Sequence, residues 1–419
     1  MSNKNNKIKL GIFGAWRGES FAAMANLTGG AEVVTVCDKL KSKADNLIAK
    51  HCPDAVYYED FDKFISHDFD AVVLCNYFDE HTEYAIKSLE ADKHVMSECV
   101  CNITVADGVK LCRAVEKSKK IYKLAENYPY SAANMEMKNL YSGGTFGNVM
   151  YAEGEYVHPM SSREFNWYTP TRNHWRSWIP TTYYITHALA PLMYMTDTMP
   201  VSVSAFAVAA PEIKKGTPAL HSDGVGIVIC RMDNGAIFRV TGWAQIGGHG
   251  NWYRLSCTKG SVESVRGDAG NIKLAYNSWD TPENTESDKI SPAKWTHSAE
   301  LADKAGHGGG DFWTMYNFIE AINKNTQPYF DVYRGVACSS AGIFAWKSVL
   351  NNSENIAMPD FRTEESRKIY ENDYMNPNPF AEDSEYKVQC GQDKNYVPSD
   401  DDIKNAYSDW KKIGYDVNA

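Results

Sequence analysis

The chain of 419 residues has the length of two or three domains and a net charge of −10 at pH 7. Its hydrophobic fraction of 43% and charged fraction of 23% are ordinary for a globular protein. Lysine and arginine form no cluster, which argues against nucleic acid as a partner. The sequence shows neither the apolar core of a signal peptide at its start nor a run of about 18 apolar residues. We therefore expect a cytoplasmic protein without a membrane partner.

The first third of the chain alternates short apolar segments with helical patterns. The expected strands are 7–13, 32–37, 71–75, 94–96 and 121–125. The expected helices between them are 20–27, 42–50, 82–91 and 104–118. This alternation predicts βαβ units and a parallel sheet, in a domain of residues 1–126.

After residue 126 the pattern changes to successive strands. These are expected at 150–156, 201–208, 226–232, 236–243, 253–257 and 261–264. Helices are expected at 182–195, 311–323 and 336–351. The pattern predicts an α/β domain of residues 127–362 on a large, mostly antiparallel sheet. Residues 363–419 are acidic and weakly patterned, which indicates an extension that packs on the surface.

A glycine turn follows the first strand, at Gly14 and Gly18. Such a turn between strand and helix lets backbone amides and the helix N-terminus meet a pyrophosphate. This turn is one residue shorter than the usual G-x-G-x-x-G pattern and lacks its middle glycine, so it is weak evidence alone. Asp38 ends the second strand, where a carboxylate binds ribose hydroxyls and disfavours a 2′-phosphate. NAD is therefore preferred over NADP; the alternative is that Asp38 only caps the next helix.

The ten cysteines are scattered without paired C-x-x-C spacing, which favours reduced thiols and no metal site.

The segments 76–81 (NYFDEH), 85–89 (AIKSL) and 93–98 (KHVMSE) resemble the Gfo/Idh/MocA oxidoreductases. That resemblance implies a Rossmann domain followed by an α/β domain on a large antiparallel sheet. One departure concerns catalysis, because the family's Glu-Lys-Pro is replaced by Glu98, Cys99 and Val100. The family lysine acts at the substrate carbonyl or hydroxyl, and a cysteine cannot replace an ammonium donor.

A second series of motifs resembles a particular branch, the NAD-dependent glycosidases of glycoside hydrolase family 109. Its members are 124–128 (LAENY), 153–158 (EGEYVH), 174–176 (HWR), 184–191 (YITHALAP), 251–254 (NWYR), 258–260 (TKG) and 307–311 (HGGGD). The described activity of that branch is α-N-acetylgalactosaminidase. In it NAD oxidises the sugar at C3, which acidifies the C2 proton, and elimination of the aglycone, water addition and re-reduction follow.

The resemblance implies two sets of site residues. The cofactor set is Gly14, Arg17, Gly18, Asp38, Asn76, Phe78, His81, Glu98, Cys99, Asn127 and His158. The substrate set is Glu126, Tyr156, Arg176, Tyr184, His187 and Tyr253. Glu126 is equally plausible as a strand-end carboxylate that orients a loop, and His158 either faces the nicotinamide or only lines the pocket.

Within the substrate set, three side chains have the chemistry of acids and bases. His187 follows Tyr184 by three residues, which places both on one helix face. Tyr156 and His158 alternate on a strand and point the same way. We assign Tyr156 as one acid or base, His187 with Tyr184 as the other, and Arg176 as a substrate clamp. The alternative for His187 is a hydrogen-bonded core histidine. The aromatic cluster of Trp175, Trp178 and Tyr183 either stacks on sugar or packs between domains.

Three functions remain open at this point. The first is a glycosidase that retains NAD. The second is a sugar dehydrogenase or 3-keto-glycoside-forming oxidoreductase, and the third is a non-catalytic NAD or sugar sensor. A homo-oligomer is expected by analogy with the family.

Overall fold

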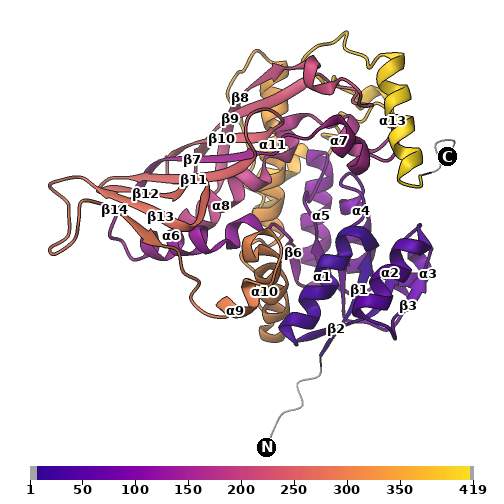
Figure 1. The fold of residues 1–419 in the computed structure, drawn as a ribbon, viewed down its shortest axis with the longest axis horizontal. Coiled ribbons are helices and arrows are strands. Elements are labelled where there is room, and N and C mark those ends of the chain that lie inside the picture. Colours follow the sequence, from indigo (N-terminus) through magenta and orange to yellow (C-terminus); the bar gives the residue numbers. More distant parts are fainter. Residues whose placement is uncertain (1–6, 416–419) are drawn as a thin grey trace, which may run out of the picture.

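Two β-sheets organise residues 7–415, the part of the chain that the computed structural model describes (Figure 1). The first sheet has six strands in the order β3-β2-β1-β4-β5-β6, and every pairing in it is parallel. Its strands are β1 (Ile8–Phe13), β2 (Ala31–Cys37), β3 (Val56–Tyr58), β4 (Ala71–Leu74), β5 (His94–Ser97) and β6 (Tyr122–Leu124). Its helices are α1 (Ala15–Thr28), α2 (Lys41–His51), α3 (Phe61–Ile65), α4 (His81–Glu90) and α5 (Val105–Ser118). The predicted parallel sheet is confirmed.

Two elements of this domain escaped the sequence analysis. β3 is a three-residue edge strand with partly exposed side chains, and α3 has only five residues. Neither is long enough to show a hydrophobic period. The first predicted helix, 20–27, was also too short at its start, because α1 begins at Ala15, directly after Gly14.

The second sheet has nine strands in the order β14-β13-β12-β11-β7-β10-β9-β8-β15. Only β10 and β7 pair in parallel, so the predicted mostly antiparallel sheet is confirmed. The strands are β7 (Val149–Val157), β8 (Pro200–Ala209), β9 (Asp223–Met232), β10 (Ile237–Ala244), β11 (Gly250–Cys257), β12 (Gly260–Val265), β13 (Asp268–Tyr276), β14 (Asp288–Pro292) and β15 (Ile356–Ala357). The sequence analysis missed β14 and β15, which form the two edges, and β13, which lies next to β14; all three carry many exposed side chains.

Helices cover one side of this sheet. They include α8, which contacts β7 and α6, and α11, which contacts β8. The α-helices of this half are α6 (Ala132–Ser142), α7 (Ser162–Tyr168), α8 (Thr186–Thr196), α9 (Ala299–Ala302), α10 (Gly310–Lys324) and α11 (Val332–Leu350). Short 3₁₀ helices are η1 (Tyr128–Tyr130), η2 (Trp175–Ser177), η3 (Thr181–Tyr184), η4 (Pro211–Lys214) and η5 (His307–Gly309). Within residues 7–415, no helix combines the length and the apolar character that a bilayer span requires.

The extension after residue 362 is more ordered than its sequence suggested. It contains α12 (Glu364–Arg367), η6 (Lys368–Tyr370), η7 (Ser384–Tyr386) and the thirteen-residue α13 (Asp400–Lys412). α13 starts with a capping box in which the hydroxyl of Ser399 and the carboxylate of Asp402 each accept a backbone N–H. This S-x-x-D signal lies in the sequence and predicts a helix start. Reading the segment as weakly patterned was therefore wrong at this point.

One lysine in the second half is fully enclosed. Lys214 is 1% exposed, its ammonium bonds to Gln245, and burial lowers its pKa from 10.5 to about 7. In the unfolded chain this lysine keeps its proton up to about pH 10.5, whereas in the folded chain it keeps the proton only below about pH 7. The buried ammonium therefore lowers the free energy of unfolding, and this loss is recovered as the pH rises from about 7 to about 10.5.

We expect Lys214→Met to remove this cost. Relative to the variant, the wild type should lose about 3 kcal/mol of unfolding free energy between about pH 9.5 and about pH 6.5. Urea denaturation at several pH values measures the difference. The exposed Lys404→Met is the matched control. Parallel pH profiles for wild type and Lys214→Met would contradict the prediction.

Candidate active site

A cavity of about 530 Å³ lies at the carboxyl ends of the parallel strands, where the strand order reverses between β1 and β4. This is the position at which ligands bind in open α/β sheets. Fourteen residues predicted for the site line it: Gly14, Arg17, Asp38, Asn76, Phe78, His81, Glu98, Cys99, Asn127, Tyr156, His158, Arg176, Tyr184 and His187. The other three, Gly18, Glu126 and Tyr253, are not among the lining residues in the described part of the chain.

The turn between β1 and α1 requires glycine at its first position. Gly14 has φ of +94°, and a Cβ there would lie 2.3 Å from the carbonyl oxygen of Cys75. Glycine also leaves the first turn of α1 without a capping side chain of its own, so its amide dipoles can face an anion. Gly18 lies inside α1, where a Cβ would meet Ile12, and its place is in the packing of the helix on β1.

Asp38 lines the same end of the cavity. Its Oδ2 accepts the backbone N–H of Ala15 at 2.6 Å, and its Oδ1 accepts that of Leu40 at 2.7 Å. The carboxylate therefore ties the start of α1 to the turn before α2. The sequence left two roles open for Asp38, ribose binding or capping of the next helix. Its contact with Leu40 lies just before α2, and its contact with Ala15 lies in the dinucleotide turn.

Arg17 joins the two halves of the molecule. Its Nε donates to Glu98 at 2.6 Å, and its two terminal nitrogens donate to Asp311 at 2.9 and 2.7 Å. Asp311 lies in the first turn of α10, 2% exposed, and also accepts from Asn127 at 2.8 Å. Arg17 and Glu98 are thus engaged with each other at the cavity wall, while the sequence assigned both to the cofactor.

Two buried amide oxygens in this wall have no partner within the described chain, Asn76 Oδ1 and Asn127 Oδ1. A buried polar atom without a partner is costly unless a ligand or water supplies one. His81 holds the loop behind them, because its ring nitrogens lie 2.9 Å from the Val100 carbonyl oxygen and 3.2 Å from that of Asn76. A glycine turn at a helix start, Asp38 beside it and free acceptors farther along fit a dinucleotide.

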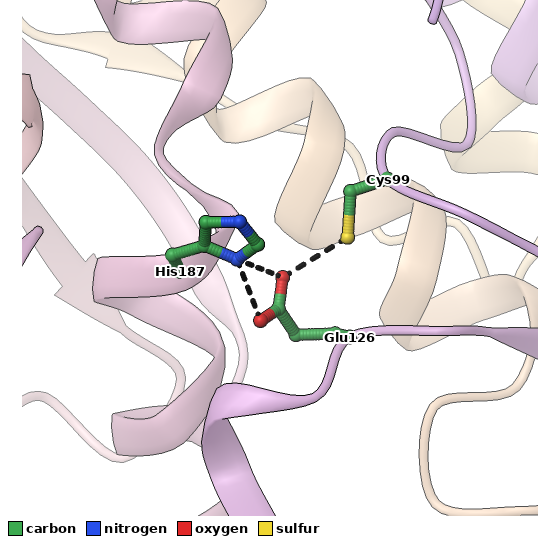
Figure 2. Close-up of side chains that lie close together, drawn as sticks. All are labelled: Cys99, Glu126 and His187. Atoms are coloured by element: carbon green, nitrogen blue, oxygen red, sulfur yellow. Dashed lines mark hydrogen bonds and ion pairs between the residues drawn. The ribbon is translucent and has the colours of Figure 1, made fainter. Parts of the chain in front are cut away.

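The opposite wall carries a buried hydrogen-bonded group of His187, Glu126, Tyr184 and Cys99, which we call the histidine relay. Figure 2 shows three of its members, Cys99, Glu126 and His187. His187 Nδ1 lies 2.8 and 3.0 Å from the two oxygens of Glu126, and its Nε2 lies 3.3 Å from the hydroxyl of Tyr184. An ionised carboxylate only accepts, so Nδ1 carries the proton and Nε2 presents a lone pair toward the cavity side. The ring of Tyr156 is 4.7 Å from that of His187.

Electrostatics separates the roles of these groups. Burial alone would raise the pKa of Glu126, but the positive charge that His187 carries when its ring is protonated, together with its hydrogen bond, holds that pKa below its ordinary value. Burial raises the pKa of Tyr156 well above 10, and Arg176 offsets this only in part. Burial likewise raises the pKa of Tyr184. The tyrosines therefore rest as proton donors, so Tyr156, assigned from the sequence as an acid or a base, suits the role of the acid.

Cys99 occupies the position of the family lysine and acts as a neutral donor. Burial, with the charge of Glu126, raises the pKa of its thiol well above 9, and Sγ donates to Glu126 Oε2 at 3.1 Å. The ligand-type atoms of Cys99, Glu126 and His187 lie within 4.8 Å of one another, a grouping the scattered cysteines did not indicate. Because the thiol keeps its proton and hydrogen bonds join all three, we interpret the group as part of the relay.

Backbone packing fixes the histidine in place. Gly154 on β7 lets α8 approach so closely that a Cβ there would lie 2.2 Å from the carbonyl oxygen of Ala188. Tyr253 on β11 donates its hydroxyl to the His187 carbonyl at 2.7 Å and is 4% exposed. Tyr253 and Glu126, both predicted to meet the substrate, therefore lie behind His187 and support it.

Arg176 faces the cavity among aromatic rings, 4.3 Å from the ring centre of Trp175 and 5.6 Å from that of Trp243. His158 lines the cavity beside Tyr156, as the strand alternation predicted. The aromatic cluster divides into two parts. Trp175 stacks on Phe78 at 4.5 Å in the cavity wall, whereas Trp178 and Tyr183 are fully buried in packing.

Several residues of the site were not found from the sequence. Tyr128 packs its ring 4.4 Å from that of His187. Lys123 is fully buried, and burial lowers its pKa to about 7, while the charge of Glu126 opposes that shift. Trp16 and Tyr415 line the cavity at its first-domain end. The buried strand residue Lys123 carried a detectable signal, because lysine is rarely placed inside an apolar strand.

Comparisons with known protein families agree with this geometry. Residues 8–126 match the model of the oxidoreductase family with an NAD-binding Rossmann fold. Residues 134–263 match the Gfo/Idh/MocA C-terminal domain, and residues 251–368 match the C-terminal domain of glycosyl hydrolase family 109.

Similar proteins fall into two groups. An α-N-acetylgalactosaminidase of Shewanella oneidensis and a glycosyl hydrolase family 109 protein of Shewanella sp. strain ANA-3 are each 23% identical, over 85% of this chain and 86% of theirs. Among solved structures, levoglucosan dehydrogenase with NADH and L-sorbose has a TM-score of 0.71 at 17% identity, covering 85% of this chain and 100% of its own. The myo-inositol 2-dehydrogenase of Lactobacillus plantarum has a TM-score of 0.63 at 15% identity, over 84% and 100%.

Proposed function

Because the chain belongs to the Gfo/Idh/MocA family of NAD-binding oxidoreductases, we propose that it cleaves glycosides with an NAD that stays bound. The observation that carries the proposal is the histidine relay facing the dinucleotide cavity. The 23% identity to family 109 glycosidases over most of both chains supports the same reaction. The substrate is then a sugar with an aglycone, oxidised at C3 and deprotonated at C2 before the aglycone leaves.

NAD, when bound, supplies a hydride acceptor for C3 of the sugar and returns the hydride after the aglycone has left. Asp38, the turn at Gly14 and the free oxygens of Asn76 and Asn127 would hold it. Glu98 anchors Arg17 at the same wall and keeps the first turn of α1 in place.

The residues of this chain divide the proton transfers. Glu126 keeps Nδ1 of His187 protonated, so that Nε2 accepts a proton from the substrate and Glu126 stabilises the imidazolium. Tyr184 borders that nitrogen and orients it. Tyr156, whose high pKa keeps its proton in place, donates to the departing or returning oxygen. Arg176 supplies donors for sugar hydroxyls from its aromatic surroundings.

The test is turnover without added cofactor. The enzyme as purified should release phenol from at least one aryl glycoside in a panel of sugars and anomers. Tyr156→Phe, which keeps the ring and removes the proton, should lower the rate about 10²-fold or more. Release of phenol from none of the glycosides, by enzyme in which bound NAD has been demonstrated, would contradict the proposal.

A sugar dehydrogenase or 3-keto-glycoside-forming oxidoreductase is the second candidate. The close fold of levoglucosan dehydrogenase favours it, whereas Cys99 in place of the family lysine weighs against it. It predicts stoichiometric NADH from free sugar or glycoside, which absorbance detects. A sensor would bind NAD or sugar and turn over neither.

Two further expectations stay predictions. The division into domains at residues 126 and 362 is one, and residence in the cytoplasm as a homo-oligomer is the other. Exposed apolar side chains on the second sheet, among them Met150 and Phe206, suit a subunit contact. Sedimentation of the purified protein would test the oligomer.

A further inference from the structure

The C-terminal end of the described chain returns to the dinucleotide cavity. Tyr415 lines the cavity together with Asp38 and Tyr77. Burial raises the pKa of Tyr415, with Asp38 close enough to add to the shift. The family models match residues up to 368, so this part of the chain lies beyond them.

α13 holds Tyr415 in position by docking on α7. Trp410 is 2% exposed, and its indole N–H donates to the carbonyl oxygens of Asn166 at 3.0 Å and Thr169 at 2.7 Å. Asn166 in turn donates to Asp409 at 3.0 Å. Figure 1 shows α13 in yellow beside α7, with its last turn directed toward the first domain. A buried tryptophan whose indole N–H is hydrogen-bonded to backbone carbonyls holds its helix firmly in place.

The helix that α13 braces reaches across to the dinucleotide turn. Tyr168, the last residue of α7, stacks on Trp16 at 5.6 Å between ring centres and 9° between planes. Trp16 lies in the first turn of α1, two residues after Gly14, and the ammonium of Lys43 lies 5.4 Å from its ring. A chain of contacts therefore runs from α13 through α7 to the turn that would hold the pyrophosphate.

We propose that residues 399–415, together with the stacked Trp16 and Tyr168, form the outer wall of the dinucleotide site and retain bound NAD between turnovers. Tyr415 closes the adenosine end near Asp38, and the stacked pair closes the side next to the turn. NAD leaves only when one of these contacts opens. The inference rests on the NAD site alone and holds for a glycosidase and for a dehydrogenase.

The experiment measures release of the cofactor without any turnover. Full-length enzyme is loaded with NADH and chased with excess NAD⁺, and the decay of bound NADH fluorescence gives the dissociation rate. Tyr415→Ala removes the closing ring but leaves α13 docked, and it should release NADH about tenfold faster. Trp410→Ala detaches α13 and should accelerate release at least as much.

Lys404→Ala is the matched control, because its side chain is 75% exposed on the same helix. It should leave the rate within about twofold of wild type. Melting curves report whether Trp410→Ala still folds, and if it does not, Tyr415→Ala decides. A Tyr415→Ala rate within about twofold of wild type, or an equal acceleration by Lys404→Ala, would overturn the proposal. If the enzyme shows no glycosidase activity but releases NADH slowly, the proposed function is contradicted and this inference is not.

Discussion

His187→Ala is expected to lower kcat for glycoside cleavage by about 10³-fold while NAD remains bound. The imidazole presents Nε2 on the cavity side, while the buried carboxylate of Glu126 holds its Nδ1. The tyrosines around it hold their protons because burial raises their pKa values. They cannot take over the abstraction of a proton near neutral pH. Phenol release from an aryl glycoside measures the loss.

Glu126→Gln separates the relay from simple loss of the ring. Glutamine keeps the shape but removes the charge that stabilises the imidazolium, so kcat should fall by about 10²-fold with little change in KM. His297→Ala, an exposed histidine outside the cavity, serves as the control. A His187→Ala enzyme that retains a tenth or more of wild-type turnover, about 1.4 kcal/mol, would rule out the relay as the general base.

Asp311→Asn is expected to destabilise the folded protein by about 3–5 kcal/mol. The carboxylate is 2% exposed and accepts hydrogen bonds from both terminal nitrogens of Arg17 and from Asn127. It also lies within hydrogen-bond distance of His307 Nδ1. Its loss leaves a guanidinium between the domains with only Glu98 as its counter-charge. Urea denaturation measures the change, with the exposed Asp303→Asn as the matched control.

The pH dependence of this difference has a definite sign. Burial would raise the pKa of Asp311, but the hydrogen bond and charge of Arg17 hold it well below 3.8. A carboxylate with a depressed pKa stabilises the fold above its ordinary pKa and loses that contribution as the pH falls. The gap between wild type and Asp311→Asn should therefore narrow below about pH 4. Equal stability of the two proteins at neutral pH would show that Arg17 has another partner.

The sequence predicted the first half of the molecule more completely than the second. Parallel strands buried on both faces, such as β4, read as continuous apolar runs between turn signals. The edge strand β14 and its neighbour β13 expose many side chains, so their sequences show no clear apolar alternation. The capping signal of Ser399 was present, but it was outweighed by the acidic composition around it.

Some contacts of the site join residues that are close in sequence, and others join residues that are far apart. Tyr184 and His187 lie three residues apart, and helix geometry alone places them together. Glu126 lies 61 residues from His187, and Asp311 lies 294 from Arg17. No local rule connects such pairs, and each of these carboxylates has equally good solvent-exposed roles when only the sequence is known. Tyr415 is more remote still, because its place depends on how α13 docks on α7.

By itself, the sequence determined the types of the long, buried elements, the dinucleotide turn and the family, since hydrophobic period, glycine placement and motif spacing are properties of neighbouring residues. Only the tertiary structure decided which residue acts on which. It turned Glu126 and Tyr253 from expected substrate contacts into supports of His187, and it engaged Arg17 with two carboxylates. The physical reason is burial: a charged side chain removed from water must take its partner from whatever the fold brings within hydrogen-bond distance.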